Sequence, residues 1–293
     1  RLELMLTFLP SRLVFLNAGG TAISGSIPSN VGELTQLQSL GVHSSRLTGT
    51  LPTEVGLLSN LRDLAVYGNR LRGTIPSEVG HLSAVQYFEA NNNELVGMLP
   101  TEIGNLVACI DFLVGSNRFT GTIPTELGKM AGVTRADLGQ NRFTGTVPPE
   151  IGDAINLRFL GLFGNERLSG RLESMLGFLP SSLVYLDAGG TAISGTIPST
   201  VGELTQLKSL GVYWSRLSGT LPTEVGLLSN LLNLALDGNQ LRGTIPSEFG
   251  HLSAVQYFDL SDNQLTGTLP AKFGNLVGCT QLIVFGNFLS GTV

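Results

Sequence analysis

Apolar residues recur along the chain with a period of 24. The unit reads L-x-x-L-x-L-x-x-N-x-L-x-G-x-I-P-x-E-V-G-x-L-x-x, and residues 61–84 show it clearly. The glycine of the unit falls at Gly25, Gly49, Gly73, Gly97, Gly121, Gly145, Gly195, Gly219, Gly243, Gly267 and Gly291. A fixed period of this length is typical of a solenoid, in which each repeat buries its apolar positions against its neighbours. The pattern predicts one solenoid of about twelve 24-residue repeats over residues 1–293.

Each part of the unit predicts a local structure. The L-x-x-L-x-L stretch alternates like a short strand, and strands of successive repeats should pair in a parallel sheet with their apolar members inward. The asparagine follows where the chain turns, and its amide can bond to backbone groups inside that turn. We expect this ladder at Asn69, Asn93, Asn117, Asn141, Asn165, Asn239, Asn263 and Asn287. Hydroxyl residues replace asparagine at Thr21, Ser45, Thr191 and Ser215, where fewer bonds and looser turns are expected.

A longer duplication overlies the short period. Residues 1–123 align without a gap with residues 171–293, and 85 of the 123 positions are identical. The two copies meet in an irregular junction, residues 166–182, whose RLESMLGFLP segment lacks the usual isoleucine–proline pair. We expect a local kink at this junction and no domain boundary.

The repeats resemble the plant-type leucine-rich repeat family. The segments GTLPTEVGLLSNL (residues 49–61) and GTIPSEVGHLSAV (residues 73–85) carry the resemblance, which covers nearly the whole chain. The family includes receptor kinases, receptor-like proteins, polygalacturonase inhibitors and related algal proteins. The resemblance implies a β-rich α/β solenoid, a right-handed superhelical stack with a concave parallel β-sheet and a short second sheet at L-x-G-x-I-P. The sequence lacks the paired-cysteine caps and the kinase segment known in that family.

The composition of the chain argues against a nucleic-acid partner and against a membrane-spanning segment. The net charge of −5 leaves no basic excess for nucleic acid, so we expect no nucleic-acid partner. The apolar runs are far shorter than the ~20 residues that span a bilayer, so no membrane segment is expected. Cys109 and Cys279 occupy equivalent leucine or valine positions 170 residues apart and are predicted to be core thiols.

No pattern indicates catalysis. His43, His81 and His251 have no cysteine or second histidine at metal-ligand spacing, and no nucleophile elbow or phosphate-binding loop is present. We therefore expect no enzymatic activity and no cofactor. Two charged stripes follow the period and are predicted to be solvated faces, with an acidic ligand along the arginine edge as the alternative. The stripes are Glu54, Glu78, Glu102, Glu126, Glu150, Glu224 and Glu248, and Arg46, Arg70, Arg118, Arg142 and Arg216.

The outward positions of the predicted sheet are the candidate binding surface. Of twenty such positions compared between the two copies, thirteen differ, whereas only three of twenty inward positions differ. Outward aromatic residues add nothing to a core and dominate binding hot spots, although aromatics also favour strands for their own sake. We predict the ligand-binding site on the second half, among aromatic and acidic residues. These are Phe159, Phe163, Tyr185, Asp187, Tyr213, Trp214, Asp237, Tyr257 and Asp259.

The sequence predicts a recognition module that binds a peptide or protein on the concave face, as a fragment of a larger receptor-like or secreted protein. The alternative is a structural or inhibitory protein of a cell wall or surface, with a carbohydrate or an enzyme as its partner. The resemblance favours an extracellular or cell-surface location. No signal peptide opens the chain, and no N-x-(S/T) sequon occurs in it. The ligand and the oligomeric state stay open.

Overall fold

A computed structural model describes residues 1–291 of the chain. The chain divides into two compact units, one comprising Arg1–Thr144 and Glu150–Leu157 and the other Gly145–Pro149 and Arg158–Val293. The division falls one repeat before the predicted junction. A single continuous solenoid over residues 1–293 remains a prediction, and its predicted end at Val293 lies outside the described residues.

Unit 1 contains six parallel main strands, one in each repeat. They are β1 (Phe15–Asn17), β3 (Ser39–Gly41), β5 (Asp63–Ala65), β6 (Tyr87–Glu89), β8 (Asp111–Leu113) and β10 (Arg135–Asp137). Their register is in phase with the 24-residue period, so that Leu40 pairs with Leu64 and Leu64 with Phe88. Stacking therefore places equivalent residues of successive repeats side by side.

Unit 2 repeats the arrangement with six further main strands. They are β12 (Phe159–Gly161), β14 (Tyr185–Asp187), β16 (Ser209–Gly211), β18 (Asn233–Ala235), β20 (Tyr257–Asp259) and β22 (Gln281–Ile283). The middle residue of each strand points inward, and Leu186, Leu210 and Leu234 are at most 1% exposed. The predicted leucine-rich repeat fold, with parallel strands one repeat apart, is confirmed.

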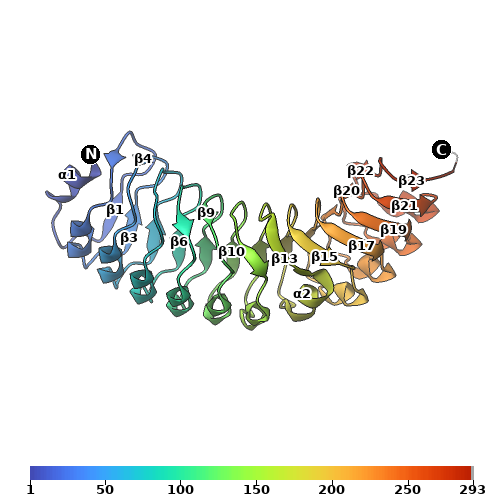
Figure 1. Cartoon of the computed structure of the whole chain (residues 1–293), viewed down its shortest axis with the longest axis horizontal. Coiled ribbons are helices and arrows are strands. Elements are labelled where there is room, and N and C mark those ends of the chain that lie inside the picture. The colour runs from blue at the N-terminus through green and yellow to red at the C-terminus, as the bar shows by residue number, and fades with distance from the viewer. Residues whose placement is uncertain (292–293) are drawn as a thin grey trace. The chain divides into compact units, whose positions relative to one another are not determined.

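The chain returns through 3₁₀ helices, each preceded by the proline of the repeat or beginning on it. These helices are η1 (Ser29–Glu33), η2 (Thr53–Leu57), η3 (Ser77–His81), η4 (Thr101–Asn105), η5 (Thr125–Lys129), η6 (Pro149–Asp153), η7 (Ser199–Glu203), η8 (Thr223–Leu227), η9 (Ser247–His251) and η10 (Ala271–Asn275). Extended backbone at the proline, with φ near −70° and ψ near 147° before η3, sets the direction of entry. In each unit the helices follow one edge of the stack (Figure 1).

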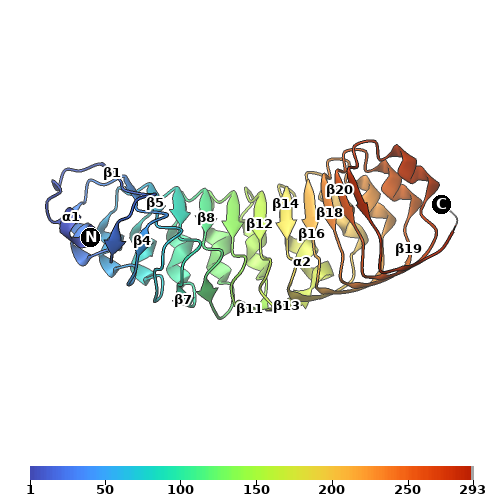
Figure 2. The same cartoon turned by 90° about the horizontal axis from the view of Figure 1, so that it is seen from above.

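The predicted second sheet is present at the L-x-G segments. In unit 1 it consists of two pairs, β2 (Ser24–Gly25) with β4 (Arg46–Leu47) and β7 (Val96–Gly97) with β9 (Arg118–Phe119). In unit 2 it is one sheet of β11 (Thr144–Thr146), β13 (Arg167–Arg171), β15 (Ala192–Gly195), β17 (Arg216–Thr220), β19 (Gln240–Thr244), β21 (Gln264–Gly267) and β23 (Phe288–Leu289). Seen from above, β14 and β16 lie along one side of unit 2 and β11 and β13 along the other (Figure 2).

The irregular junction forms a regular element. Its segment folds as α2 (Leu172–Phe178), and the equivalent segment of the first copy folds as α1 (Leu2–Leu6). Helix α2 buries Leu172, Met175 and Leu176, which follow the i, i+3, i+4 spacing of one helix face. A short α-helix thus takes the place of the 3₁₀ helix where the isoleucine–proline pair is missing.

The asparagine ladder is confirmed in the structure. The Asn93 amide donates to the carbonyls of Val66, Ala90 and Asn91, and its Oδ1 accepts from the Leu71 backbone N–H at 3.0 Å. Two of these partners belong to the preceding repeat, so the side chain joins neighbours as well as closing its own turn. The hydroxyl replacements make fewer bonds, as predicted; Ser45 donates only to the His43 carbonyl.

The prediction of two core thiols holds for one of them. Cys109 is fully buried, and burial raises the pKa of its thiol to about 12. Cys279 is only half-buried, because it lies in the last described repeat, where no further repeat stacks on it. Both cysteines are free thiols.

Candidate ligand-binding surface

The outward side chains of the main strands, with those of the second and third residues after each strand, form a surface that we call the strand face. All nine predicted site residues lie on the strand face of unit 2. Pairing aligns Phe159 with Tyr185, and Tyr185 with Ser209 in β16. Tyr213 and Trp214 are the second and third residues after β16. The structure therefore gathers these residues on neighbouring strands.

The aromatic rings of unit 2 rest on one another and on glycines. The Phe159 and Tyr185 rings lie 6.1 Å apart at an interplanar angle of 41°. A Cβ atom added at Gly189 would stand 2.4 Å from the Tyr213 ring, and one at Gly238 would stand 2.7 Å from the Trp214 ring. Each of these two rings therefore covers a glycine of a neighbouring repeat, in a space that a larger residue would fill.

Trp214 occupies a backbone position that does not suit it. The equivalent residue has a positive φ in every repeat, and in six of the twelve it is a glycine. Trp214 has φ +46°, and its side chain is 62% exposed. A bulky residue in the left-handed region is strained, and such strain persists where the surrounding structure or the function requires it. The indole is neither needed by the core nor favoured by its backbone.

Carboxylates lie between the rings. The Tyr213 hydroxyl donates to Asp187 Oδ2 over 3.5 Å, and burial, together with the nearby Asp187 charge, raises the pKa of Tyr213 to about 12. Burial and the charge of Asp259 raise the pKa of Asp237, and a hydrogen bond from the Trp214 side chain opposes this shift. The charges of Asp259 and Asp262 oppose the charged form of Asp237, so a positive charge brought to this surface would be favoured.

Asp259 requires a correction. We placed it among the accessible acidic residues, but it is only 6% exposed. The Tyr257 hydroxyl donates to its Oδ2 at 2.9 Å, and the Ser261 backbone N–H and hydroxyl both donate to its Oδ1. Strand alternation predicts on which face a side chain lies, but not whether neighbouring hydroxyl groups already cover it.

A second feature, which we did not single out from the sequence, lies on the strand face of unit 1. A hollow of about 280 Å³ opens over β3 and β5 between aromatic and acidic side chains. A sequence signal existed: Gly41 and Ala65 are small outward residues, and Phe15 and Tyr87 are large ones on the flanking strands. In the first copy, His43 and Ser44 stand where the second copy has Tyr213 and Trp214.

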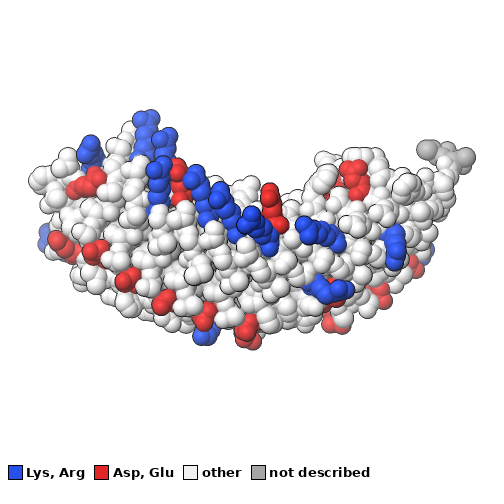
Figure 3. Space-filling view, in the orientation of Figure 1, with Lys and Arg blue, Asp and Glu red and all other residues white. Residues whose placement is uncertain are grey.

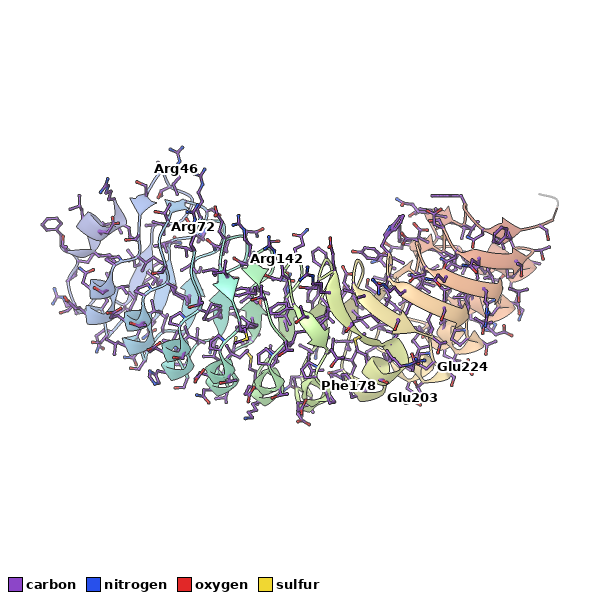
Figure 4. All side chains as sticks on the ribbon, in the orientation of Figure 1. Arg46, Arg72, Arg142, Phe178, Glu203 and Glu224 are labelled. Carbon is purple, nitrogen blue, oxygen red and sulfur yellow. The ribbon has the colours of Figure 1, made fainter. Side chains whose placement is uncertain are left out.

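The charged stripes follow the edges of each unit, as the period predicts. Arg46, Arg72 and Arg142 project from one edge and Glu203 and Glu224 from the helix edge (Figure 4). In the space-filling view, basic side chains form a row along the upper edge of unit 1, and acidic ones lie along its helices (Figure 3). The Glu94 carboxylate pairs with Arg72 Nε at 3.2 Å and with Arg118 at 3.5 Å. These pairs are largely exposed and contribute little to stability.

Within residues 1–291, no three histidine, cysteine or acidic side chains are grouped so as to hold a metal ion. Over the same residues, no helix has both the length and the apolar character to cross a membrane.

A family model described as "Leucine rich repeat" matches residues 229–289. No curated protein matched the chain.

Solved structures gave many matches. A structure titled as a TDR receptor is 30% identical over 97% of this chain and 53% of its own, with a TM-score of 0.87. The plant peptide hormone receptor RGFR1, solved in complex with RGF2, is 29% identical over 96% of this chain and 48% of its own, with a TM-score of 0.83. A leucine-rich repeat protein of Leptospira interrogans is 30% identical over 90% of this chain and 64% of its own, with a TM-score of 0.77. The chain spans about half the length of the two receptors.

Proposed function

The chain belongs to the plant-type leucine-rich repeat family, and from this premise we propose that it recognises a peptide or protein ligand on the strand face of unit 2. The plant peptide hormone receptor RGFR1 was solved in complex with RGF2, which supports ligand recognition as the activity of this kind of repeat. The same likeness supports an extracellular or cell-surface location and a non-enzymatic role.

The exposed and strained Trp214 is the observation that carries the proposal. A tryptophan held at φ +46°, where half of the repeats use glycine, costs stability and exposes a large apolar ring. Tryptophan and tyrosine are enriched among the residues that contribute most to binding energy. A role in ligand binding explains the presence of the Trp214 indole at this position, since the fold does not require it.

The neighbouring groups define the chemistry of the ligand. Tyr185 and Phe159 extend the apolar surface toward β12, and Asp187 and Asp237 add half-buried negative charge. A segment with an apolar or aromatic residue beside a basic one would match both features. Removing the acidic residues should mainly slow association, because charge pairing at the rim acts on encounter more than on the final affinity.

The test is a peptide-display screen on the whole chain, followed by titration of the hits through the fluorescence of Trp214, the single tryptophan. Two variants, Trp214→Ser and Tyr213→His, restore the residues of the first copy and are titrated calorimetrically. Each should weaken binding about tenfold or more, as expected for a hot-spot residue.

Leu227→Ser is the matched control. Leu227 lies in the same repeat as Trp214 but in helix η8, and it is 60% exposed, close to the exposure of Trp214. This variant should bind like the wild type. Ligands that keep full affinity for both strand-face variants would refute the proposal, and a screen that yields only carbohydrate or enzyme partners would favour the structural or inhibitory alternative.

A further inference from the structure

The hollow on the strand face of unit 1 is built from small residues surrounded by large ones. Its floor consists of Ser39, Gly41 and Ala65, all of which are buried. Phe15 on β1 and Tyr87 on β6 rise on either side, and these rings are 63% and 40% exposed. Strands lie about 4.8 Å apart, so the opening between β1 and β6 is wide enough for a side chain of a partner.

A stacked pair of rings forms a third wall. The His43 and Tyr67 rings lie 4.6 Å apart and are nearly parallel, at 10°. His43 also lies over Gly19, where an added Cβ atom would clash with the imidazole at 2.3 Å. The His43 Nδ1 atom is buried and has no hydrogen-bond partner. A polar atom is thus left unsatisfied beside the hollow.

Two carboxylates line the hollow, and they differ in their bonding. The Ser39 hydroxyl donates to Asp63 Oδ2 at 2.8 Å. Glu89 is half-buried, and no described group donates a hydrogen bond to its carboxylate. Burial raises the pKa of Glu89, as do the charges of Asp63 and Asp111, while the charges of His43 and Arg135 oppose the shift. A half-buried carboxylate that accepts no hydrogen bond is unfavourable, and a cation that donates hydrogen bonds to it would be favoured.

We infer that this hollow is a binding site for the guanidinium group of an arginine side chain presented by a peptide or protein partner. A guanidinium is planar, can stack against Tyr87 or Phe15 and carries five N–H donors, enough to reach Glu89 and Asp63 together. An ammonium ion is a more strongly hydrated point charge and makes less use of the aromatic walls.

The second copy shows what distinguishes this site. The residue equivalent to Glu89 is Asp259, whose carboxylate is buried and already bonded by Tyr257 and Ser261. The floor is the same in both copies, since Ser209, Gly211 and Ala235 replace Ser39, Gly41 and Ala65. A carboxylate that stands over this floor and accepts no hydrogen bond is therefore found in unit 1 and not at the equivalent position of unit 2. The inference concerns a different surface from the unit 2 patch and stands or fails independently of it.

The experiment titrates the whole chain with three small probes, observed by NMR. They are N-acetyl-arginine methylamide, the matching lysine compound and the neutral isostere with citrulline. The arginine probe should bind at millimolar concentration and should shift resonances of Ala65 and Glu89, with at least tenfold weaker binding by the other two. Equal binding of the citrulline or lysine probe, or no binding of the arginine probe, would overturn the assignment.

Two variants and one control locate the site. Glu89→Gln should weaken arginine binding about tenfold or more, whereas Asp259→Asn should leave it unchanged. Ala65→Leu should block the hollow from its floor while preserving the fold, because the equivalent residue of β8 is already Leu113. Unchanged affinity in Ala65→Leu or Glu89→Gln, or an equal loss in Asp259→Asn, would contradict the inference.

Discussion

At the scale of single residues, the same backbone position can serve stability or recognition. The residue five places after the start of each main strand has a positive φ in every repeat. Polar residues such as Ser44 and Asn92 tolerate this conformation with modest strain, whereas Trp214 does not. The sequence alone identified Trp214 as an outward aromatic, but its backbone strain became apparent only with the dihedral angles.

The strain at Trp214 can be measured with a pair of variants. Both Trp214→Ala and Trp214→Gly remove the indole, but only glycine accepts φ +46° without a steric penalty. The glycine variant should be more stable than the alanine variant by about 1 kcal/mol in denaturant unfolding. At Tyr213, whose φ is not positive, the order should be reversed. An alanine variant at position 214 as stable as the glycine variant would show that the position is not strained.

The asparagine ladder supports a second prediction at this scale. Asn93→Ser removes side-chain hydrogen bonds to two repeats and leaves buried carbonyl groups unpaired. The free energy of unfolding should fall by about 1–3 kcal/mol. Asn60→Ser is the control, because the Asn60 amide makes one exposed bond, to the Thr35 carbonyl. Urea unfolding of both variants measures the difference. Equal losses would mean that the ladder contributes no more than a surface contact.

Glu89 predicts a dependence of stability on pH. Its pKa is raised in the folded chain above the ordinary value of 4.5, by burial and by Asp63 and Asp111, while His43 and Arg135 oppose the shift. The folded state therefore holds its proton to a higher pH than the unfolded state, and Glu89 lowers stability as the pH rises through the raised pKa. Glu89→Gln should melt at a higher temperature than the wild type at neutral pH, and the difference should vanish below about pH 4.5. A difference independent of pH would argue against a buried, unpaired charge.

At the scale of elements, the 24-residue period predicted the structures that recur in every repeat. It did not predict the features that occur in one repeat or that depend on several repeats together. Strand positions and the second sheet follow from a 24-residue repeat, because stacking forces equivalent residues together. Helix α2 was not predicted, since its segment lacks the pair of aliphatic residue and proline, isoleucine–proline in the repeat unit, that stands before the 3₁₀ helix in the other repeats. The hollow of unit 1 was also missed, because it depends on the sizes of four neighbouring strands' side chains rather than on any one repeat.

The inward residue of the last main strand is partly exposed, which predicts weaker protection from hydrogen exchange near the ends of the chain. Leu282 in β22 is 43% exposed, whereas the equivalent inward residues Leu234 and Phe258 are fully buried. Each repeat is stabilised by its neighbours, so protection should fall toward both ends. Helix α1 covers the first repeat with Leu2 and Leu6. Protection from hydrogen exchange should therefore fall more steeply at β22 than at the first repeat. Hydrogen exchange resolved by peptide measures this, and uniform protection along the chain would contradict it.

At the scale of the whole molecule, the two copies share their core and turn residues and differ on the strand face. Inward residues and turn asparagines are kept, while the strand face has been changed, so that unit 1 offers an unpaired acid over a small floor and unit 2 offers exposed rings. A scaffold that preserves its core and varies one surface is suited to recognising different groups of a ligand with each copy. The position of the candidate surface could be predicted from alternation and duplication, whereas the accessibility of each residue could not.

A hydrogen-exchange footprint of a bound ligand tests the central claim most directly. The chain is exchanged with and without a saturating peptide from the display screen, and protection is mapped on peptides from each repeat. We predict new protection in residues 185–191, 209–215 and 233–239, which contain β14, β16 and β18 with the residues after them, and none in η8 or along the arginine edge. Protection confined to the helices or to the segments around Arg46, Arg118 and Arg142 would contradict it.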